Sequence, residues 1–183
     1  MNHLGTVDLE TDRLILRRFK ISDSETMFNN WASDPEVTKY LMWAPHENIS
    51  ETANILKKWI EEYGNKKIYN WAIVLKDKNE LIGNISIVDL NEKLRSVHFG
   101  FCIGKKWWNK GIASEALSFL IDFFFKDIKI NRVESRHDPR NSGSGKVMKK
   151  CGMLYEGTIR QGDWNNKGIC DYTIYGITLD DYI

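Results

Sequence analysis

The chain has 183 residues, of which 42% are hydrophobic and 28% charged, a composition typical of one globular domain with a real core. Its formal net charge is +1, which disfavours electrostatic capture of nucleic acid or of an anionic membrane. No apolar run approaches the roughly 20 residues of a spanning helix. Three cysteines in no metal-ligand spacing favour a reduced, cytoplasmic protein without a metal centre.

The first half of the chain predicts strand 14–19, two helices and then three strands. Ser22 and Glu25 have the spacing of a capping box and open the first predicted helix. Ser50 is predicted to cap the second, whose apolar residues recur at helical spacing and which Gly64 ends. The short connections between the next three strands predict an antiparallel meander. These strands are predicted at residues 69–75, 81–88 and 96–103.

The second half predicts two helices and three more strands. A loop rich in Gly, Asn and Asp is expected between the last two strands. Together the elements predict a single mixed α+β domain over residues 1–183, with about seven strands in a mostly antiparallel sheet and about four helices. Residues 1–10 are expected to form a short N-terminal tail. The predicted elements are helix 114–126, strand 132–136, a helix from Asn141 to Cys151, and strands 153–159 and 170–178.

The most informative stretch is the turn between strand 96–103 and the helix after it. At a helix N-terminus the backbone N–H groups and the macrodipole converge on one point, which suits a phosphate or diphosphate. Gly111 has no Cβ and lets a ligand come close to the backbone. Lys105, Lys106 and Lys110 add positive charge. The turn therefore predicts an anion site.

A nucleotide hydrolase is excluded, although Ser142–Lys146 superficially resembles a phosphate-binding loop. The first glycine of that motif would fall on Arg140, and the hydroxyl residue after the lysine would fall on Val147. No dinucleotide-binding glycine motif follows a strand either.

Five blocks of sequence resemble, in the right order, those of the GCN5-related N-acetyltransferase superfamily, within its Rim-type branch of ribosomal-protein N-terminal acetyltransferases. The resemblance runs from about Thr11 to Asp181. It implies a sheet that splays in the middle, acetyl-CoA as cosubstrate, no metal, and direct transfer to a primary amine in a ternary complex. The blocks are Thr11–Arg17, Phe99–Gly104, Trp108–Ala113, Asn131–Glu134 with Asn141–Ser144 and Lys150–Gly157, and Asp171–Tyr172.

The resemblance also implies which residues bind acetyl-CoA. The backbone of Phe101 and Ile103 would hold the pantetheine arm and polarise the thioester carbonyl. Asn141 would contact the same arm. Trp108 replaces the Gln or Arg that opens the family's signature, and its role is open. The predicted cofactor-binding residues are Phe101, Ile103, Trp108, Asn109, Lys110, Gly111, Ile112, Ala113, Ser114, Asn141 and Ser144.

Two residues are candidates for catalysis. Ser144 lies where the branch often places a hydroxyl near the coenzyme sulfur and would protonate the leaving thiolate; alternatively it only makes a local helix hydrogen bond. His98 lies where relatives often carry Glu, and an imidazole pKa suits a general base; alternatively it is a half-buried strand residue. His137 is a second candidate base. Trp43 and His46 are expected to line an acceptor pocket.

The sequence thus predicts an acetyl-CoA-dependent N-acetyltransferase of the cytoplasm. The acceptor is left open between a protein N-terminus, an antibiotic amine, a polyamine and an amino acid. The alternative is a non-catalytic acyl-CoA-binding regulatory module. Neither nucleic acid nor a membrane is expected as a partner, and a homo-oligomer is left open.

Overall fold

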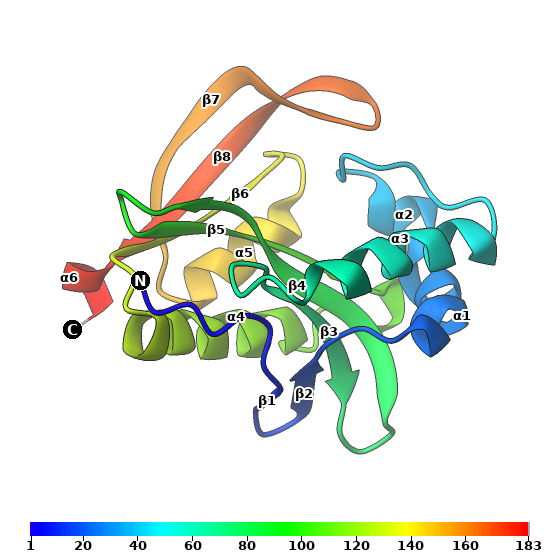
Figure 1. Cartoon of the computed structure of the whole chain (residues 1–183). Coiled ribbons are helices and arrows are strands. Elements are labelled where there is room, and N and C mark those ends of the chain that lie inside the picture. Colours follow the sequence, from blue (N-terminus) through cyan, green and yellow to red (C-terminus); the bar gives the residue numbers. More distant parts are fainter. Residues whose placement is uncertain (183) are drawn as a thin grey trace.

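A central sheet of eight strands dominates the computed structural model, which describes residues 1–182 (Figure 1). The strands are β1 (Leu9–Glu10), β2 (Leu14–Arg17), β3 (Asn70–Leu75), β4 (Glu80–Asn91), β5 (Ser96–Ile103), β6 (Arg132–His137), β7 (Leu154–Asn165) and β8 (Gly168–Thr178). Their order in the sheet is β1-β2-β3-β4-β5-β6-β8-β7. Every neighbouring pair is antiparallel except β5 and β6, which are parallel.

Helices cover both faces of the sheet (Figure 1). The α-helices are α1 (Ser24–Met27), α2 (Pro35–Thr38), α3 (Ile49–Glu62), α4 (Ile112–Phe123), α5 (Ser142–Lys150) and α6 (Leu179–Tyr182). Short 3₁₀ segments are η1 (Ile21–Asp23) and η3 (Lys105–Trp107), and π-helical segments are η2 (Phe28–Ala32) and η4 (Phe124–Ile128).

The mixed, mostly antiparallel α/β domain is confirmed, but the predicted counts of about seven strands and about four helices were too low. The additional elements are very short. Strand β1 has 2 residues, and α2 and α6 have 4 residues each. Segments of that length are too short to show a periodic pattern in the sequence.

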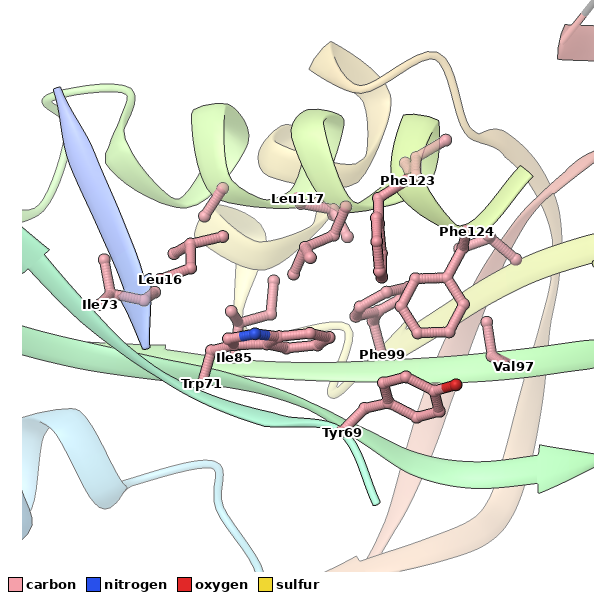
Figure 2. Packing of buried hydrophobic residues seen from close by; sticks show 14 of the residues in the cluster. Leu16, Tyr69, Trp71, Ile73, Ile85, Val97, Phe99, Leu117, Phe123 and Phe124 are labelled. Atoms are coloured by element: carbon pink, nitrogen blue, oxygen red, sulfur yellow. The ribbon is translucent and has the colours of Figure 1, made fainter. Parts of the chain in front are cut away.

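The hydrophobic core lies in two layers, one on each face of the sheet. On the α4 face, Phe124 meets the rings of Tyr69, Trp71 and Phe99 at centroid distances of 4.9, 6.3 and 5.2 Å (Figure 2). On the other face, the side chains of α1, η2 and α3 cover the sheet around the buried Trp31. Strand β5 lies between the two layers, because its alternate residues face opposite sides.

Strands β5 and β6 separate soon after they pair. Their parallel register runs only from Ser96↔Arg132 to His98↔Glu134. The hydroxyl of Ser135 then donates to the carbonyl of Phe99 at 2.8 Å, and the rest of β5 has no strand on that side within the described residues. The predicted splay of the sheet is therefore confirmed.

The first ten residues do not form a tail. Residues Leu9–Glu10 pair with β2, and the buried Thr6 donates its hydroxyl to the carbonyl of Ile68 at 3.0 Å. The backbone N–H of Asn2 donates to the carbonyl of Ile128 at 2.7 Å. The contacts of Thr6 and Asn2 join residues far apart in the sequence, so local patterns could not predict them.

Strands β7 and β8 form a long hairpin where a polar loop was expected between residues 159 and 170 (Figure 1). Most residues of β7 are exposed, so the segment lacks the apolar alternation that marks a strand. The hairpin end is held by Asn166, whose backbone N–H donates to the carbonyl of Leu41 at 2.9 Å. Its side-chain amide donates to the carbonyls of Thr38 and Trp43 at 2.8 and 2.9 Å.

Two predicted helix caps were also wrong. Helix α3 is capped by Asn48, whose side chain accepts from the N–H of Glu51 at 3.0 Å, and not by Ser50. At the first helix, the N-cap of α1 is Asp23 and not Ser22; the Asp23 side chain makes no capping hydrogen bond to α1, and its carboxylate instead accepts from the N–H of Lys20, the N-cap of η1, at 2.8 Å. In both places a side chain of similar chemistry stands next to the true cap, and the sequence alone does not separate them.

Candidate functional site

The turn before α4 has an unusual backbone shape. Gly111 is the N-cap of α4 and has φ +74°, and Asn109 has φ +60°. Both values lie in the left-handed region, which glycine and asparagine tolerate best. The N–H groups at the start of α4 have no intrahelical acceptor, as in any helix. The turn therefore has the backbone shape that the predicted anion site requires, with a glycine at the start of the helix.

Arg13 ties this turn to the sheet. Its Nε donates to Glu115 at 2.6 Å, and its Nη1 donates to the carbonyl of Lys110 at 3.1 Å. Although partial burial opposes ionisation of Glu115, hydrogen bonds from Thr11 and Arg13 hold its pKa below the ordinary value. A cavity of about 510 Å³ lies beside the turn, and Arg13, Lys110 and Lys150 line it. Three basic side chains thus surround the N-terminus of α4.

A second cavity of about 680 Å³ begins at the same turn and continues through the gap between β5 and β6 as far as α2. It reaches both faces of the sheet. Phe101 belongs to the face that packs on α4, whereas Gly100 and Cys102 face the other side. Its wall includes Gly100–Ile103, Gly111–Ser114, Ser135–Asp138, Asn141–Ser144, Glu36, Tyr40 and Leu41.

All of the predicted cofactor-binding residues line one of the two cavities. Lys110 lines the smaller one, and the others line the larger one. Asn141 caps α5, since its Oδ1 accepts from the N–H of Ser144 at 3.4 Å. Its Nδ2 also donates to the hydroxyl oxygen of Ser144 at 3.1 Å. Both residues therefore have a structural role and also face the cavity.

His98 does not line either cavity and is not brought together with Ser144. It is 8% exposed and lies on the face away from α4, because its neighbours Val97 and Phe99 belong to the α4-side core. Gly100, two residues on, faces the same way and does line the larger cavity. The imidazole therefore lies just beyond the cavity wall.

The surroundings of His98 keep it neutral. Burial lowers its pKa from the ordinary value of 6.5, and the nearby charge of Arg136 acts in the same direction. The carboxylates of Glu134, Asp89 and Asp163 oppose this effect but do not cancel it. A neutral imidazole at pH 7 can accept a proton.

The lowered pKa of His98 predicts a pH dependence of folding. The unfolded chain, with the higher histidine pKa, binds the proton more readily, so the free energy of unfolding falls as the pH drops below about 6.5 towards the folded pKa. We expect His98→Gln to reduce this loss. Urea unfolding of both proteins at pH 7.5 and 5.5 measures it. Equal losses in the two proteins would show that His98 does not titrate as described.

The remaining predicted residues, Trp43, His46 and His137, differ in whether they line a cavity. His46 is buried, contacts the hydroxyl of Thr52 at 2.7 Å and lines neither cavity, and nor does Trp43. The expected acceptor pocket at these two residues therefore stays a prediction, since they lie outside the linings of the two cavities described here. His137 does line the larger cavity. Its Nε2 is buried without a hydrogen-bond partner among the described residues and lies 2.9 Å from where a Cβ on Gly145 would stand.

Sequence reasoning missed the wall that α2 and the end of β6 form. Tyr40 lies in this wall, and its ring makes cation–π contacts with Lys39, whose Nζ is 5.5 Å from the ring centroid, and with Arg140, whose Cζ is 5.9 Å from it. Asp138 accepts from Arg140 and, at 3.1 Å, from the side chain of Asn165. The sequence signals near this wall are two Asp–Pro pairs, at residues 34–35 and 138–139, and such pairs indicate only a turn or a helix boundary.

Within residues 1–182, no group of three His, Cys, Asp or Glu side chains is placed to hold a metal ion. No helix in the same range combines the length and apolar character needed to cross a membrane.

Together, the donor-rich helix N-terminus, the unpaired strand edge and the cavity that joins them define a protein that binds an acyl-CoA. Comparison with known proteins agrees. A family model described as "Acetyltransferase (GNAT) domain" matches residues 13–154. The chain belongs to this family, and it is an acetyl-CoA-dependent N-acetyltransferase.

Individual relatives are similar over nearly the whole chain. The uncharacterized N-acetyltransferase YoaA of Bacillus subtilis (strain 168) is 32% identical over 169 residues, covering 92% of this chain and 95% of the relative. A ribosomal protein uS5 alanine N-acetyltransferase of Escherichia coli (strain K12) is 25% identical over 196 residues, covering 99% and 95%. The crystal structure of a GNAT-family acetyltransferase from Bacillus anthracis superposes with a TM-score of 0.83 at 28% identity, covering 94% and 98%.

Proposed function

We propose that the protein transfers the acetyl group directly to a primary amine, in a ternary complex, with the coenzyme on one side of the β5–β6 gap and the amine on the other. The observation that carries this proposal is the 680 Å³ cavity, which joins the α4 turn to the face away from α4. The residues present fit the coenzyme. The turn offers N–H donors and basic side chains to a diphosphate, and β5 offers an unpaired edge to a chain of amides.

A covalent acetyl-enzyme is not needed. Bound acetyl-CoA supplies an already activated thioester, so the protein has to orient the amine and manage protons. Cys102 is the cysteine on the cavity wall, and burial raises the pKa of its thiol to about 12. Almost none of it is thiolate at neutral pH, which disfavours it as a nucleophile.

The backbone of β5 polarises the thioester carbonyl. The N–H of Phe101 lies on the edge that has no partner strand, because alternate residues of a strand present their backbone groups to the same edge. A preorganised N–H aimed at a developing negative charge lowers the barrier of acyl transfer.

Ser144 donates a proton to the departing sulfur. Its oxygen already accepts a hydrogen bond from Asn141, so its own O–H is free to point into the cavity. We expect Ser144→Ala to lower kcat about 10- to 100-fold, since general acids contribute on the order of 100-fold or more. The Kd of acetyl-CoA should change less than about threefold.

Steady-state kinetics and calorimetry on Ser144→Ala test this role. Ser50→Ala is the matched control, because it removes an exposed hydroxyl from the first turn of another helix, α3, and lines neither cavity. A Ser144→Ala enzyme with full kcat would remove the residue from the mechanism.

His98 takes the proton of the amine through water. Its neutral imidazole lies just past Gly100, on the side of the sheet where the amine would enter. Such a weak base suits an α-amine, with a pKa of about 8, better than a lysine amine, with a pKa of about 10. We therefore favour a protein or peptide N-terminus as the acceptor, over small-molecule amines. The name of the Escherichia coli relative supports the same class.

The test is to incubate the protein with acetyl-CoA and a panel of amines and to follow the release of free thiol. Peptides with free N-termini, acetylated peptides, polyamines and amino acids form the panel. We expect turnover on free N-termini. Turnover only on small amines would overturn the acceptor class, and coenzyme binding without turnover on any amine would point to a regulatory module. The three free cysteines are the basis for proposing a cytoplasmic location.

A further inference from the structure

Trp108 makes a hydrogen bond that explains its presence in the turn. Its indole Nε1 donates to the backbone carbonyl of Ile103 at 2.7 Å. The ring is 40% exposed and lines the larger cavity. Trp108 is therefore not a core residue. A Gln or Arg at this position would offer a different donor, on a flexible side chain in place of a rigid ring.

The carbonyl that Trp108 occupies belongs to the open edge of β5. The N–H of Gly104 donates to Ile82 on the β4 side at 2.9 Å. Backbone groups alternate between the two edges of a strand, so Phe99, Phe101 and Ile103 present theirs to the gap beside β6. This agrees with the hydroxyl of Ser135 reaching the Phe99 carbonyl.

Two side chains thus bracket the open edge. Ser135 occupies the Phe99 carbonyl at one end, at 2.8 Å, and Trp108 occupies the Ile103 carbonyl at the other, at 2.7 Å. Between them, the carbonyl of Phe101 is the acceptor left without a partner on this edge, among residues 99–103 of the described structure.

We propose that Trp108 is a positioning residue that fixes the register of the pantetheine arm on β5. The inference rests on the proposed binding of acetyl-CoA along this edge. The arm contains two amides, and each could donate to any free carbonyl of the strand. An open Ile103 carbonyl would allow the arm to slide by two residues, or roughly 7 Å. With that carbonyl filled, the arm's N–H groups can bind only at Phe101, which places the thioester at one position.

The first test compares two ligands on Trp108→Phe, which keeps a ring and removes the Nε1 donor. We expect kcat to fall about tenfold, because an arm bound in the wrong register presents the thioester away from the amine, while the Kd of acetyl-CoA, measured by calorimetry, should change less than about threefold. The Kd of 3′-phosphoadenosine 5′-diphosphate, which has the diphosphate but no pantetheine arm, should change less than twofold. The matched control is Trp164→Phe, which removes an exposed indole on β7 and should change none of these values.

Each other outcome has one meaning. Equal weakening of both ligands would place Trp108 at the diphosphate and overturn the inference, and so would an unchanged kcat. If the unaltered protein binds neither ligand, the proposed function itself fails, and Trp108 is not the cause.

The second test uses the unaltered protein and does not depend on the folding of a variant. In an NMR spectrum, the indole N–H of Trp108 should exchange slowly with water both before and after saturation with acetyl-CoA. The exposed indole of Trp164 in the same sample gives the fast reference. If the Trp108 signal exchanges as fast as that of Trp164 once acetyl-CoA binds, the carbonyl has been released to the ligand and the proposal is wrong.

Discussion

Gly111→Val is expected to raise the Kd of acetyl-CoA at least about 100-fold. Gly111 has φ +74°, a left-handed conformation that a β-branched residue avoids at a cost of about 1–2 kcal/mol. A new Cβ would also stand 3.6 Å from Arg13 Nη2 and from Lys150 Nζ, in the space where the diphosphate approaches. Loss of even one or two charge-assisted hydrogen bonds, at about 1.5–3 kcal/mol each, accounts for the factor.

Calorimetric titration measures this effect, and thermal unfolding confirms that the variant folds. Gly64→Val is the control, because nothing lies within 4 Å of its added Cβ and its φ is not left-handed. An unchanged Kd in Gly111→Val would mean that the turn before α4 does not hold the diphosphate.

Phe124→Ala is expected to lower the free energy of unfolding by about 3–5 kcal/mol. Phe124 is completely buried, and its ring meets those of Tyr69, Trp71 and Phe99 (Figure 2). Little can move to fill the space that the ring leaves. Phe99 belongs to β5, so the space left by the missing Phe124 ring should also loosen the strand that we propose binds the coenzyme.

Urea unfolding followed by circular dichroism measures the loss. Leu154→Ala, a truncation of an exposed side chain on β7, should change stability by less than about 0.5 kcal/mol. A loss in Phe124→Ala as small as in Leu154→Ala would show that the aromatic cluster is not the centre of the core.

Much of the coenzyme half of the molecule was predictable from the sequence, because its signals are local. Alternating apolar residues predicted a strand over 96–103, and β5 spans the same residues. The basic glycine turn directly follows it, and a strongly apolar helix comes next. Order along the chain was enough to single out Gly111, whereas Phe101 and Asn141 were predicted from the resemblance to the acetyltransferase family; all three line the larger cavity.

The part of the molecule around α2 and the β7–β8 hairpin was not predictable, because its contacts join distant segments. Asn166 holds residues 38–43 through three hydrogen bonds across more than 120 positions. Nothing in the polar sequence around it signals that role. Likewise, the sequence placed His98 on the central strand but could not show that its side chain ends beyond the cavity wall, since that depends on where β5 and β6 separate.

The most direct test of the account is a crystal structure of the protein with acetyl-CoA. We expect the diphosphate within hydrogen-bond distance of the N–H groups of Gly111, Ile112 and Ala113, and the thioester beside the backbone of Phe101. A coenzyme bound outside the gap between β5 and β6, or a diphosphate away from the start of α4, would contradict it.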